Sequence, residues 1–572
     1  MNLARLDLAA LAARVVVPLL DLRRPDRDAE WARAEARARA GFGGFLLFGG
    51  ELPELPARLA ALRAAAGDPA GAPFVCADLE RGLGQQVRGG TRVPPAMALG
   101  AAGSPELARR AGAALGREAL AAGIDWVLGP VLDLSDEPRN PIVGTRALGA
   151  DPARVAALGA AWIEGLQAAG ALACAKHYPG HGATTDDSHA ALPRVTRPGE
   201  ALRARDLAPF RAAVAAGVAS VMTAHVAYPT LEPGPAGPAT LSRALVQELL
   251  RGELGYQGLV VTDALIMDGV RQELSEEAAA CAALAAGCDA LLYPHDPEAV
   301  AGAVAAWAAR DPAHERRLRE AAGRVLAARG RWPAPDGTRA GEVDAALPLE
   351  LSRAALCRAG QPLAPLAAGE PLTVLLLDDD ADPRAPQGAA VGFGVELLAS
   401  LDEAGVPLRL HVLTPAGPEA SFLAARAAAR EAGRLLAVVG CRVRAWKGRP
   451  GLHPRLLALL AGLPPARLTV AGLCGPAPLG LGRQGAAAEA VVPGALGDGG
   501  FAAALGNGGF AAALGNGGFA AALGDGGFAA ALGDGGFAAG AEVLLAWGDE
   551  PAAQRAAAEA LLGAITPAGQ LP

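Results

Sequence analysis

The 572-residue sequence predicts an α/β protein in two parts, a (β/α)8 barrel of the TIM type followed by a smaller open α/β sandwich domain. Over the first 340 residues, short branched apolar runs alternate with longer Ala/Leu/Arg stretches of helical period, a pattern typical of βα units around a parallel sheet. A second series of apolar runs begins near residue 371. A chain of this length also exceeds what one hydrophobic core usually organises.

The barrel prediction rests on eight apolar runs, each expected to form a strand that is followed by a loop and a helix. They span residues 14–20, 42–48, 73–80, 125–134, 171–177, 220–226, 258–265 and 289–294. One helix start is expected at Ser104, where a hydroxyl that can cap the helix precedes Pro105 and Glu106. Eight such units predict a (β/α)8 barrel over residues 1–340.

The second domain is expected over residues 371–572, after an irregular linker at residues 341–370. Its apolar runs span residues 372–377, 408–413, 435–439, 468–473 and 543–547. They again alternate with Ala/Leu/Arg stretches, so we expect a doubly wound sandwich rather than a second barrel.

Residues 497–540 of this domain hold five near copies of the unit Gly-Asp/Asn-Gly-Gly-Phe-Ala-Ala-Ala-Leu. A calcium-binding nonapeptide solenoid needs the pattern Gly-Gly-x-Gly-x-Asp. Here Gly499 and Gly500 are followed by Phe501 and three alanines, so no aspartate falls at the ligand position. We interpret the repeat as a low-complexity tandem insertion and assign it no function.

Composition and charge exclude several classes of partner. The net charge of −8 and the pI near 5.6 offer no basic surface for nucleic acid. Seven scattered cysteines without a CxxC pair indicate buried thiols in a reducing compartment. Arg14 and Pro18 break the N-terminal apolar run, which predicts neither a signal peptide nor a membrane span. We expect a cytoplasmic protein that needs no cofactor, and the sequence leaves its oligomeric state open.

Polar residues gather where the predicted barrel strands end. Barrel enzymes place their chemistry at the carboxyl ends of the strands, so this clustering predicts a cleft there. The residues concerned are Asp78, Glu80, Asp133, the 140–146 loop, Lys176, His177, His225, Asp263, Tyr293 and His295. Lys176 is notable because Lys447 is the only other lysine of the chain.

The densest polar stretch runs from Lys176 to His189 and carries three histidines. His177 and His181 are four residues apart, a spacing that unites two metal ligands on one face of a helix. Pro179 and Gly180 prevent a helix here, so we predict no metal site and keep a metal-dependent barrel hydrolase as an alternative.

Two groups in this region suit glycosyl transfer. In the Asp187-Ser188-His189 segment, the carboxylate can fix the imidazole tautomer, so that His189 can donate and then accept a proton. Asp263 ends an apolar strand as an isolated carboxylate, placed to attack or stabilise a cationic centre. A noncatalytic module that binds a glycan in the same cleft is the alternative from a different class.

These segments resemble glycoside hydrolase family 3, and within it the bacterial β-N-acetylhexosaminidases in their two-domain form. The matching segments are Asp78 to Gly82, Asn140 to Arg146, Lys176 to His189, Val261 to Leu265 and the C-terminal Ile565 to Pro572. The resemblance spans nearly the whole chain, and the histidine-rich segment is its most specific part.

The resemblance implies a role for each matching residue. Asp263 would be the nucleophile that forms a covalent glycosyl-enzyme, and His189, paired with Asp187, would be the acid/base. The terminal sugar would be bound by Asp78, Arg88, Arg146, Lys176 and His177. The implied reaction is the removal, with retention, of terminal β-linked N-acetylglucosamine from muropeptides derived from peptidoglycan or from chitooligosaccharides.

The position of the acid/base distinguishes the branches of the family. The resemblance implies that β-glucosidases draw an acid/base carboxylate from the second domain, whereas the hexosaminidase branch carries Asp-x-His on the barrel, as Asp187 and His189 stand here. Two departures weigh on the substrate: Ala183 replaces a polar residue, and Leu79 with Arg81 alters the first segment. The match is weaker at Arg88, which lies farther from Glu80 than the family pattern has it. A β-glucosidase, another exo-glycosidase or a phosphorylase of the family is the alternative.

Overall fold

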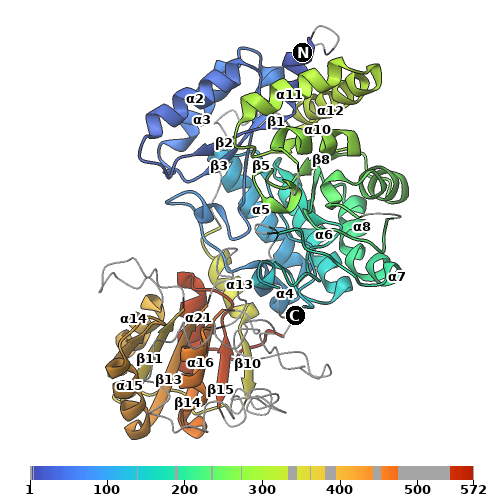
Figure 1. Cartoon of the computed structure of the whole chain (residues 1–572). Helices are drawn as coiled ribbons and strands as arrows, with labels where there is room; N and C mark the ends of the chain where they lie inside the picture. Colours follow the sequence, from blue (N-terminus) through green and yellow to red (C-terminus); the bar gives the residue numbers. More distant parts are fainter. Residues whose placement is uncertain are drawn as a thin grey trace. The chain divides into compact units, whose positions relative to one another are not determined.

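The computed structural model describes residues 3, 6–137, 140–186, 188, 191–232, 236–271, 274–332, 344–360, 362–379, 394–441, 452–474 and 541–570. Within these residues the chain forms two compact units, the first ending at Ala355 and the second beginning at Leu356 (Figure 1). Each has a core of its own.

The first unit is built on a curled, fully parallel sheet with helices on its outside (Figure 1). Seven strands are hydrogen-bonded in chain order. They are β2 (Leu19–Asp21), β3 (Gly44–Phe48), β4 (Phe74–Ala77), β5 (Trp126–Val127), β6 (Leu172–Tyr178), β7 (Ser220–Thr223) and β8 (Leu259–Thr262). Because the strands are parallel, all their carboxyl ends lie at the same edge of the sheet.

Two further short strands form a separate pair, β1 (Val16–Val17) with β9 (Leu291–Leu292). Pro18 separates β1 from β2 because it has no N–H to give to a ladder. Its carbonyl still accepts the N–H of Leu46 at 2.8 Å. Each of the eight apolar runs predicted in this part of the chain therefore contains a strand.

The helices of the first unit follow the predicted alternation. They include α1 (Leu8–Arg14), α2 (Arg27–Arg39), α3 (Leu55–Ala65), α4 (Ala96–Ala102), α5 (Pro105–Ala121), α6 (Pro152–Ala168), α8 (Ala208–Ala215), α9 (Asp268–Arg271), α10 (Glu276–Ala286), α11 (Pro297–Ala309) and α12 (Pro312–Arg331). The cap predicted at Ser104 is confirmed, because its hydroxyl accepts the N–H of Leu107 at 3.2 Å and α5 begins at Pro105. Asp151 caps α6 in the same way.

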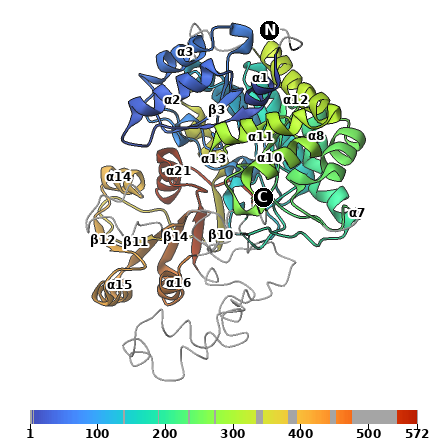
Figure 2. The same cartoon turned by 45° about the horizontal axis from the view of Figure 1, so that its top comes forward.

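The second unit contains a six-stranded sheet in the order β10-β15-β14-β13-β11-β12. Its strands are β10 (Cys357–Gly360), β11 (Leu372–Asp378), β12 (Leu408–Leu413), β13 (Arg434–Gly440), β14 (Leu468–Leu473) and β15 (Glu542–Leu545). Among these strands, which are those of the described residues, only β10 runs antiparallel to its neighbour. Helices α14 (Val395–Glu403) and α21 (Pro551–Leu561) lie on one face, and α15 (Glu419–Glu431) and α16 (Pro454–Ala461) on the other (Figure 2).

The segment expected as a linker, residues 341–370, contains two regular elements. Helix α13 (Leu347–Ala355) belongs to the first unit, and β10 belongs to the second. Leu347 and Leu351, one helical turn apart, are both buried, which explains why this stretch is helical. The nonapeptide repeat at residues 497–540 lies outside the described residues. None of the described helices combines the length and apolar content needed to cross a membrane.

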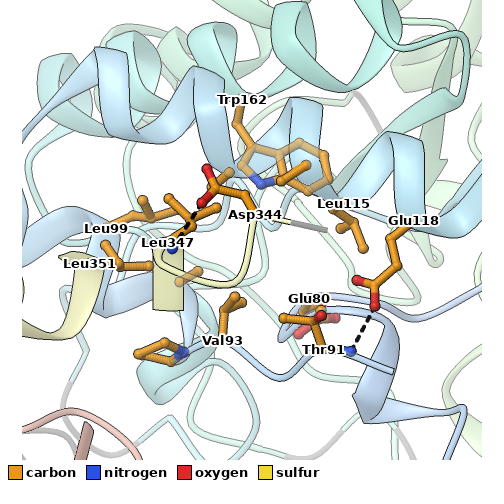
Figure 3. Close-up of a pocket in the computed structure, with 15 residues that line it drawn as sticks. Glu80, Thr91, Val93, Leu99, Leu115, Glu118, Trp162, Asp344, Leu347 and Leu351 are labelled. Carbon is orange, nitrogen blue, oxygen red and sulfur yellow. Dashed lines mark hydrogen bonds between the residues drawn. The ribbon is translucent and has the colours of Figure 1, made fainter. Parts of the chain in front are cut away.

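A small cavity of about 40 Å³ lies between α13 and helices α4, α5 and α6 (Figure 3). Leu99, Leu115, Trp162, Leu347 and Leu351 form its apolar wall. Glu80 lines it on another side, so the cavity lies behind a residue that also takes part in the polar cluster described below.

We predict that Leu351→Ala destabilises the first unit by about 2–5 kcal/mol, because it enlarges this cavity and removes buried apolar contacts. The measurement is denaturant unfolding followed by tryptophan fluorescence. Leu423→Ala removes the same atoms from a side chain that is 58% exposed, and should change stability by less than about 0.5 kcal/mol. Equal effects of the two substitutions would show that α13 is not part of the packed core.

Candidate active site

Five polar side chains lie at the carboxyl ends of neighbouring strands in the first unit. Asp78 follows β4, Lys176 and His177 lie near the end of β6, His225 follows β7 and Asp263 follows β8. Parallel pairing of these strands brings residues that are far apart in sequence to one edge of the sheet.

Lys176 is the centre of a buried ion-pair network. Its ammonium lies 2.6 Å from Oδ1 of Asp78 and 2.7 Å from Oε1 of Glu80, and the residue is 1% exposed. Arg146 donates to both carboxylate oxygens of Glu80, each at 2.8 Å. The network therefore joins two cations to two carboxylates.

The charges of this network hold one another in the ionised state. Burial alone would lower the pKa of Lys176, but attraction to Asp78 and Glu80 outweighs it and raises that pKa. Burial would likewise raise the pKa of Glu80, yet Arg146 and Lys176 hold it well below its ordinary value. Removing any one of these side chains would leave the network with an unbalanced net charge.

The buried carboxylate of Asp133 holds the histidine-rich loop through hydrogen bonds. Its carboxylate accepts the Nδ1–H of His177 at 2.7 Å and the backbone N–H groups of His177 at 3.2 Å and His181 at 2.6 Å. Burial acts to raise the pKa of Asp133, but the two histidines and these donors bring it below its ordinary value. Since a carboxylate only accepts, Nδ1 of His177 carries the proton, and Nε2 is left for other partners.

His181 holds the loop rather than offering a free ring. Its Nδ1 lies 2.9 Å from the hydroxyl of Thr184, and its Nε2 lies 2.9 Å from the hydroxyl of Ser188. Burial lowers the pKa of His181 to about 4, so the ring is neutral at neutral pH. His177 and His181 meet edge to face, with ring centroids 6.0 Å apart, and in the described part of the chain no cluster of side chains is arranged to hold a metal ion.

Asn140 ties the loop to the segment after β5. Its amide donates to the carbonyls of His181 and Gly182 and to the hydroxyl of Thr184, at 3.0–3.2 Å. Its oxygen accepts the N–H groups of Ile142 and Val143. The same turn carries Arg146, so one side chain positions two parts of the site.

Asp263 is a half-buried carboxylate at the end of β8. Burial acts to raise its pKa, but nearby His177 and His225 and the N–H of Ala264 lower it below its ordinary value. The N–H of Ala264 donates to its Oδ1 at 2.8 Å. Asp263 is therefore an ionised carboxylate at the same edge as the Lys176 network, and an ionised carboxylate has the chemistry of an oxygen nucleophile or an electrostatic stabiliser.

Comparison with known proteins gives this arrangement a family. The model of the glycosyl hydrolase family 3 N-terminal domain matches residues 19–328. The chain belongs to glycosyl hydrolase family 3. The β-hexosaminidase of Pseudomonas aeruginosa is 39% identical over 292 residues, which are 49% of this chain and 84% of that protein.

Two other relatives extend the comparison. The β-N-acetylglucosaminidase/β-glucosidase of Cellulomonas fimi is 40% identical over 262 residues, which cover 44% of this chain and 46% of that protein. The structure of a family 3 β-N-acetylglucosaminidase from Paenibacillus sp. FPU-7 aligns over 99% of this chain and 98% of that chain, with a TM-score of 0.77 and 27% identity. The two-part α/β architecture thus also occurs in this family.

The site residues predicted for this family 3 glycosidase are placed unevenly by the structure. Asp78, Arg146, Lys176, His177 and Asp263 are brought to one edge of the sheet. Asp187 and His189 lie outside the described residues. Ser188 between them is buried, and its carbonyl accepts the N–H of Gly269 in α9 at 3.1 Å.

The close approach at Gly269 leaves no room for a larger residue. A Cβ at this position would lie 2.7 Å from the carbonyl oxygen of Ser188 and 3.1 Å from that of His225. The loop that carries the predicted acid/base is therefore in direct contact with the segment that follows Asp263.

Arg88 does not join the cluster. Its side chain is 80% exposed and pairs with Glu51 at 3.3 Å. A 3-10 turn, Leu83–Gln85, and an isolated bridge between Glu51 and Arg88 place it beside the segment after β3 instead. His295, at the predicted rim, is exposed as well and pairs with Glu276.

Two residues central to the candidate site lie at predicted strand ends, but their sequence pattern indicates no specific role. Glu80 links Arg146 to Lys176, and Asp133 links His177 to His181. An acidic residue at the end of an apolar strand was the available signal. Its choice of partner depends on which loops meet in space, which spacing along the chain does not encode.

We predict that His181 makes the stability of the first unit depend on pH. Its folded-state pKa of about 4 lies below the ordinary value of 6.5, so as the pH falls the unfolded chain takes up the proton first. Stability is therefore fully present above pH 6.5 and is lost as the pH falls toward 4. Between pH 7 and pH 5 the loss from this group should be about 2 kcal/mol.

Denaturant unfolding at the two pH values measures this loss. In His181→Gln the difference between pH 7 and pH 5 should shrink by that amount, whatever the overall stability of the variant. His295→Gln, which alters a side chain that is 63% exposed, should leave the difference unchanged. An unchanged pH dependence in His181→Gln would contradict a neutral, buried His181.

Proposed function

We propose that this protein is a retaining exo-glycosidase that releases terminal β-linked N-acetylglucosamine. One observation supports this most: Asp263, an ionised carboxylate, stands at the same sheet edge as the Lys176–Asp78–Glu80–Arg146 network and His177. Asp263 provides a nucleophile for an anomeric carbon. The network and His177 provide a fixed set of charged and polar hydrogen-bonding groups for a single sugar.

The proposed reaction has two steps. In the first, an oxygen of Asp263 attacks the anomeric carbon while His189 gives its proton to the glycosidic oxygen, so the bond to the leaving group breaks and a glycosyl ester forms. In the second, His189 takes a proton from a water molecule, and the water oxygen attacks the anomeric carbon and displaces Asp263. Asp187 would hold His189 in the required tautomer.

The geometry of the network supports the proposed sugar-binding groups. Asp78 spends Oδ1 on Lys176 but its side chain is 31% exposed, so it can accept hydrogen bonds from sugar hydroxyls. Nε2 of His177 is available because Nδ1 donates to Asp133. Lys176 and Arg146 complete the proposed set, whereas Arg88 is excluded by its place on the surface.

The preference for N-acetylglucosamine rests on relatives and on the loop. The P. aeruginosa relative is a β-hexosaminidase, and the Asp187-Ser188-His189 segment lies on the first unit. The second candidate is β-glucoside hydrolysis, because the name of the C. fimi relative carries both activities. Muropeptides derived from peptidoglycan, or chitooligosaccharides, are the proposed natural substrates.

The proposal extends to the architecture and location. We infer that the first unit closes into an eight-stranded barrel, since β1 pairs with β9 and an isolated bridge joins Val261 to Ala290 beside β8. Catalysis would then lie in residues 1–340, with residues 371–572 as an α/β sandwich. The proposed cytoplasmic location is supported by Cys76, Cys174 and Cys288, which are buried and form no disulfide.

We predict that Asp263→Ala lowers the hydrolysis of an aryl N-acetyl-β-glucosaminide by about a thousandfold or more, because it removes the nucleophile. Asp268→Ala is the matched control, since Asp268 is an exposed carboxylate five residues further along the chain. Mass spectrometry after reaction with a slow fluorinated glycoside should find the sugar on the peptide that contains Asp263. Hydrolysis at the wild-type rate by Asp263→Ala would refute the assignment.

The sugar preference is a separate prediction. We expect kcat/KM for the aryl N-acetylglucosaminide to exceed that for the aryl glucoside by at least about tenfold, since a site that binds the acetamido group leaves polar groups unpaired when the group is missing. The product should be free sugar with or without added phosphate. Equal or faster turnover of the glucoside would assign the enzyme to β-glucosidases, and a sugar phosphate as product would assign it to phosphorylases.

A further inference from the structure

His225 is a fully buried histidine that the reaction described above does not use. It follows β7 and lies next to the turn that follows Asp263. Its Nε2 is 3.1 Å from the carbonyl oxygen of Ala264, and its Nδ1 is 2.8 Å from the hydroxyl of Thr240. Both ring nitrogens therefore have partners inside the protein.

The partners determine the tautomer of the ring. A carbonyl oxygen can only accept, so Nε2 of His225 must carry a proton. Burial lowers the pKa of His225 despite the attraction of Asp263, and the ring is neutral. Nδ1 is then unprotonated and can only accept a hydrogen bond, so the Thr240 hydroxyl must donate to it.

The hydroxyl of Thr240 has one proton and two candidate acceptors. The carbonyl of Ala224 lies 3.1 Å away, whereas Nδ1 of His225 lies at 2.8 Å. If the proton went to Ala224, two lone pairs would face each other at 2.8 Å in a buried site. Donation to His225 avoids this repulsion, and the oxygen of Thr240 then accepts from the hydroxyl of Thr223 at 3.0 Å.

The hydrogen bonds form a directed chain that ends beside Asp263. It runs from Thr223 through Thr240 and His225 to the carbonyl of Ala264. That carbonyl also accepts the N–H of Met267, while the N–H of Ala264 donates to Asp263. The backbone carbonyl of Thr223 accepts the N–H of Asp263 at 3.2 Å. The peptide group before Asp263 and the one after Ala264 are thus held by β7 and its extension.

We propose that His225, held as the neutral Nε2–H tautomer by the hydroxyls of Thr240 and Thr223, is the positioning residue that aims Asp263 at the anomeric carbon. The inference rests on the proposed function, in which Asp263 is the nucleophile. A nucleophile must be held to within about half an ångström of its attack geometry, so loosening the Ala264 carbonyl slows the chemical step more than it weakens sugar binding.

The test uses two substitutions of Thr240, one that keeps its size and one that keeps its hydroxyl. Thr240→Val keeps the shape but removes the hydroxyl, and should lower kcat for the aryl N-acetylglucosaminide about tenfold to a hundredfold, with KM within about twofold of wild type. Thr240→Ser keeps the hydroxyl and should stay within about threefold of wild-type kcat. Thr230→Val removes an exposed threonine hydroxyl and should change neither constant.

A spectroscopic readout tests the tautomer without relying on activity. In protein labelled with ¹⁵N-histidine, one imidazole should show a protonated Nε2 and an unprotonated Nδ1 at pH 7, and this signal should disappear in His225→Gln. In Thr240→Val the ring should keep its Nε2 proton, because the Ala264 carbonyl still needs a donor, while the resonance of the unprotonated Nδ1 should shift because it loses the hydrogen bond from the hydroxyl. An Nδ1–H or doubly protonated His225 in the wild-type protein would overturn the proposal.

The outcomes separate this proposal from the proposed function. Wild-type kcat in Thr240→Val, or equal losses in the valine and serine variants, would refute the positioning role while leaving Asp263 as nucleophile. Full activity of Asp263→Ala would refute the nucleophile assignment and the positioning role with it, whatever tautomer the spectra show. If Thr240→Val fails to fold, Thr240→Ser and the wild-type spectra still decide the tautomer.

Discussion

The site depends on one buried ammonium group, that of Lys176. A cation without water is costly unless opposite charges surround it, and Asp78 and Glu80 provide those charges from the strand end across the sheet. Arg146 balances the second carboxylate and fixes the turn after β5. The network thus couples three segments of chain, and its two buried members, Lys176 and Glu80, have their charged partners only when these segments meet.

The carboxylate of Asp133 has a different role from this network. Its oxygens accept hydrogen bonds from the loop itself, namely from the ring and backbone of His177 and the backbone of His181. The Lys176 network therefore presents charged groups at the carboxyl edge of the sheet, while Asp133 fixes the histidine-rich loop. His181 and Asn140 add neutral hydrogen bonds to those of Asp133, and these hold the loop without adding charge.

Sequence reasoning predicted the order of the elements well because strands and helices are local patterns. Each predicted apolar run of the first unit contains a strand, and the cap at Ser104 is where the hydroxyl and proline indicated it. Strand lengths were less predictable: the run at residues 125–134 contains only the short β5, since Pro130 lies within it. Helix α13 was missed because an isolated pair of leucines in a polar stretch becomes informative only once its packing partners are known.

The site was predictable as a list of residues but not as a set of partnerships. Motif spacing identified Asp78, Lys176, His177 and Asp263, yet it also suggested Arg88, whose exposed position depends on a turn and a bridge. The roles of Glu80, Asp133 and His225 come from contacts across the sheet. Such contacts are set by the curvature of the sheet and the meeting of loops, which no short stretch of sequence contains.

The contact between Gly269 and Ser188 has a consequence for how this scaffold can be altered. The segment that follows the strand of Asp263 packs against the loop between Lys176 and His189 through this backbone contact. A loop transplanted from a relative would therefore pack against a segment that is shaped for the original loop. In engineering of this glycosidase, the two segments should be exchanged together or both left in place.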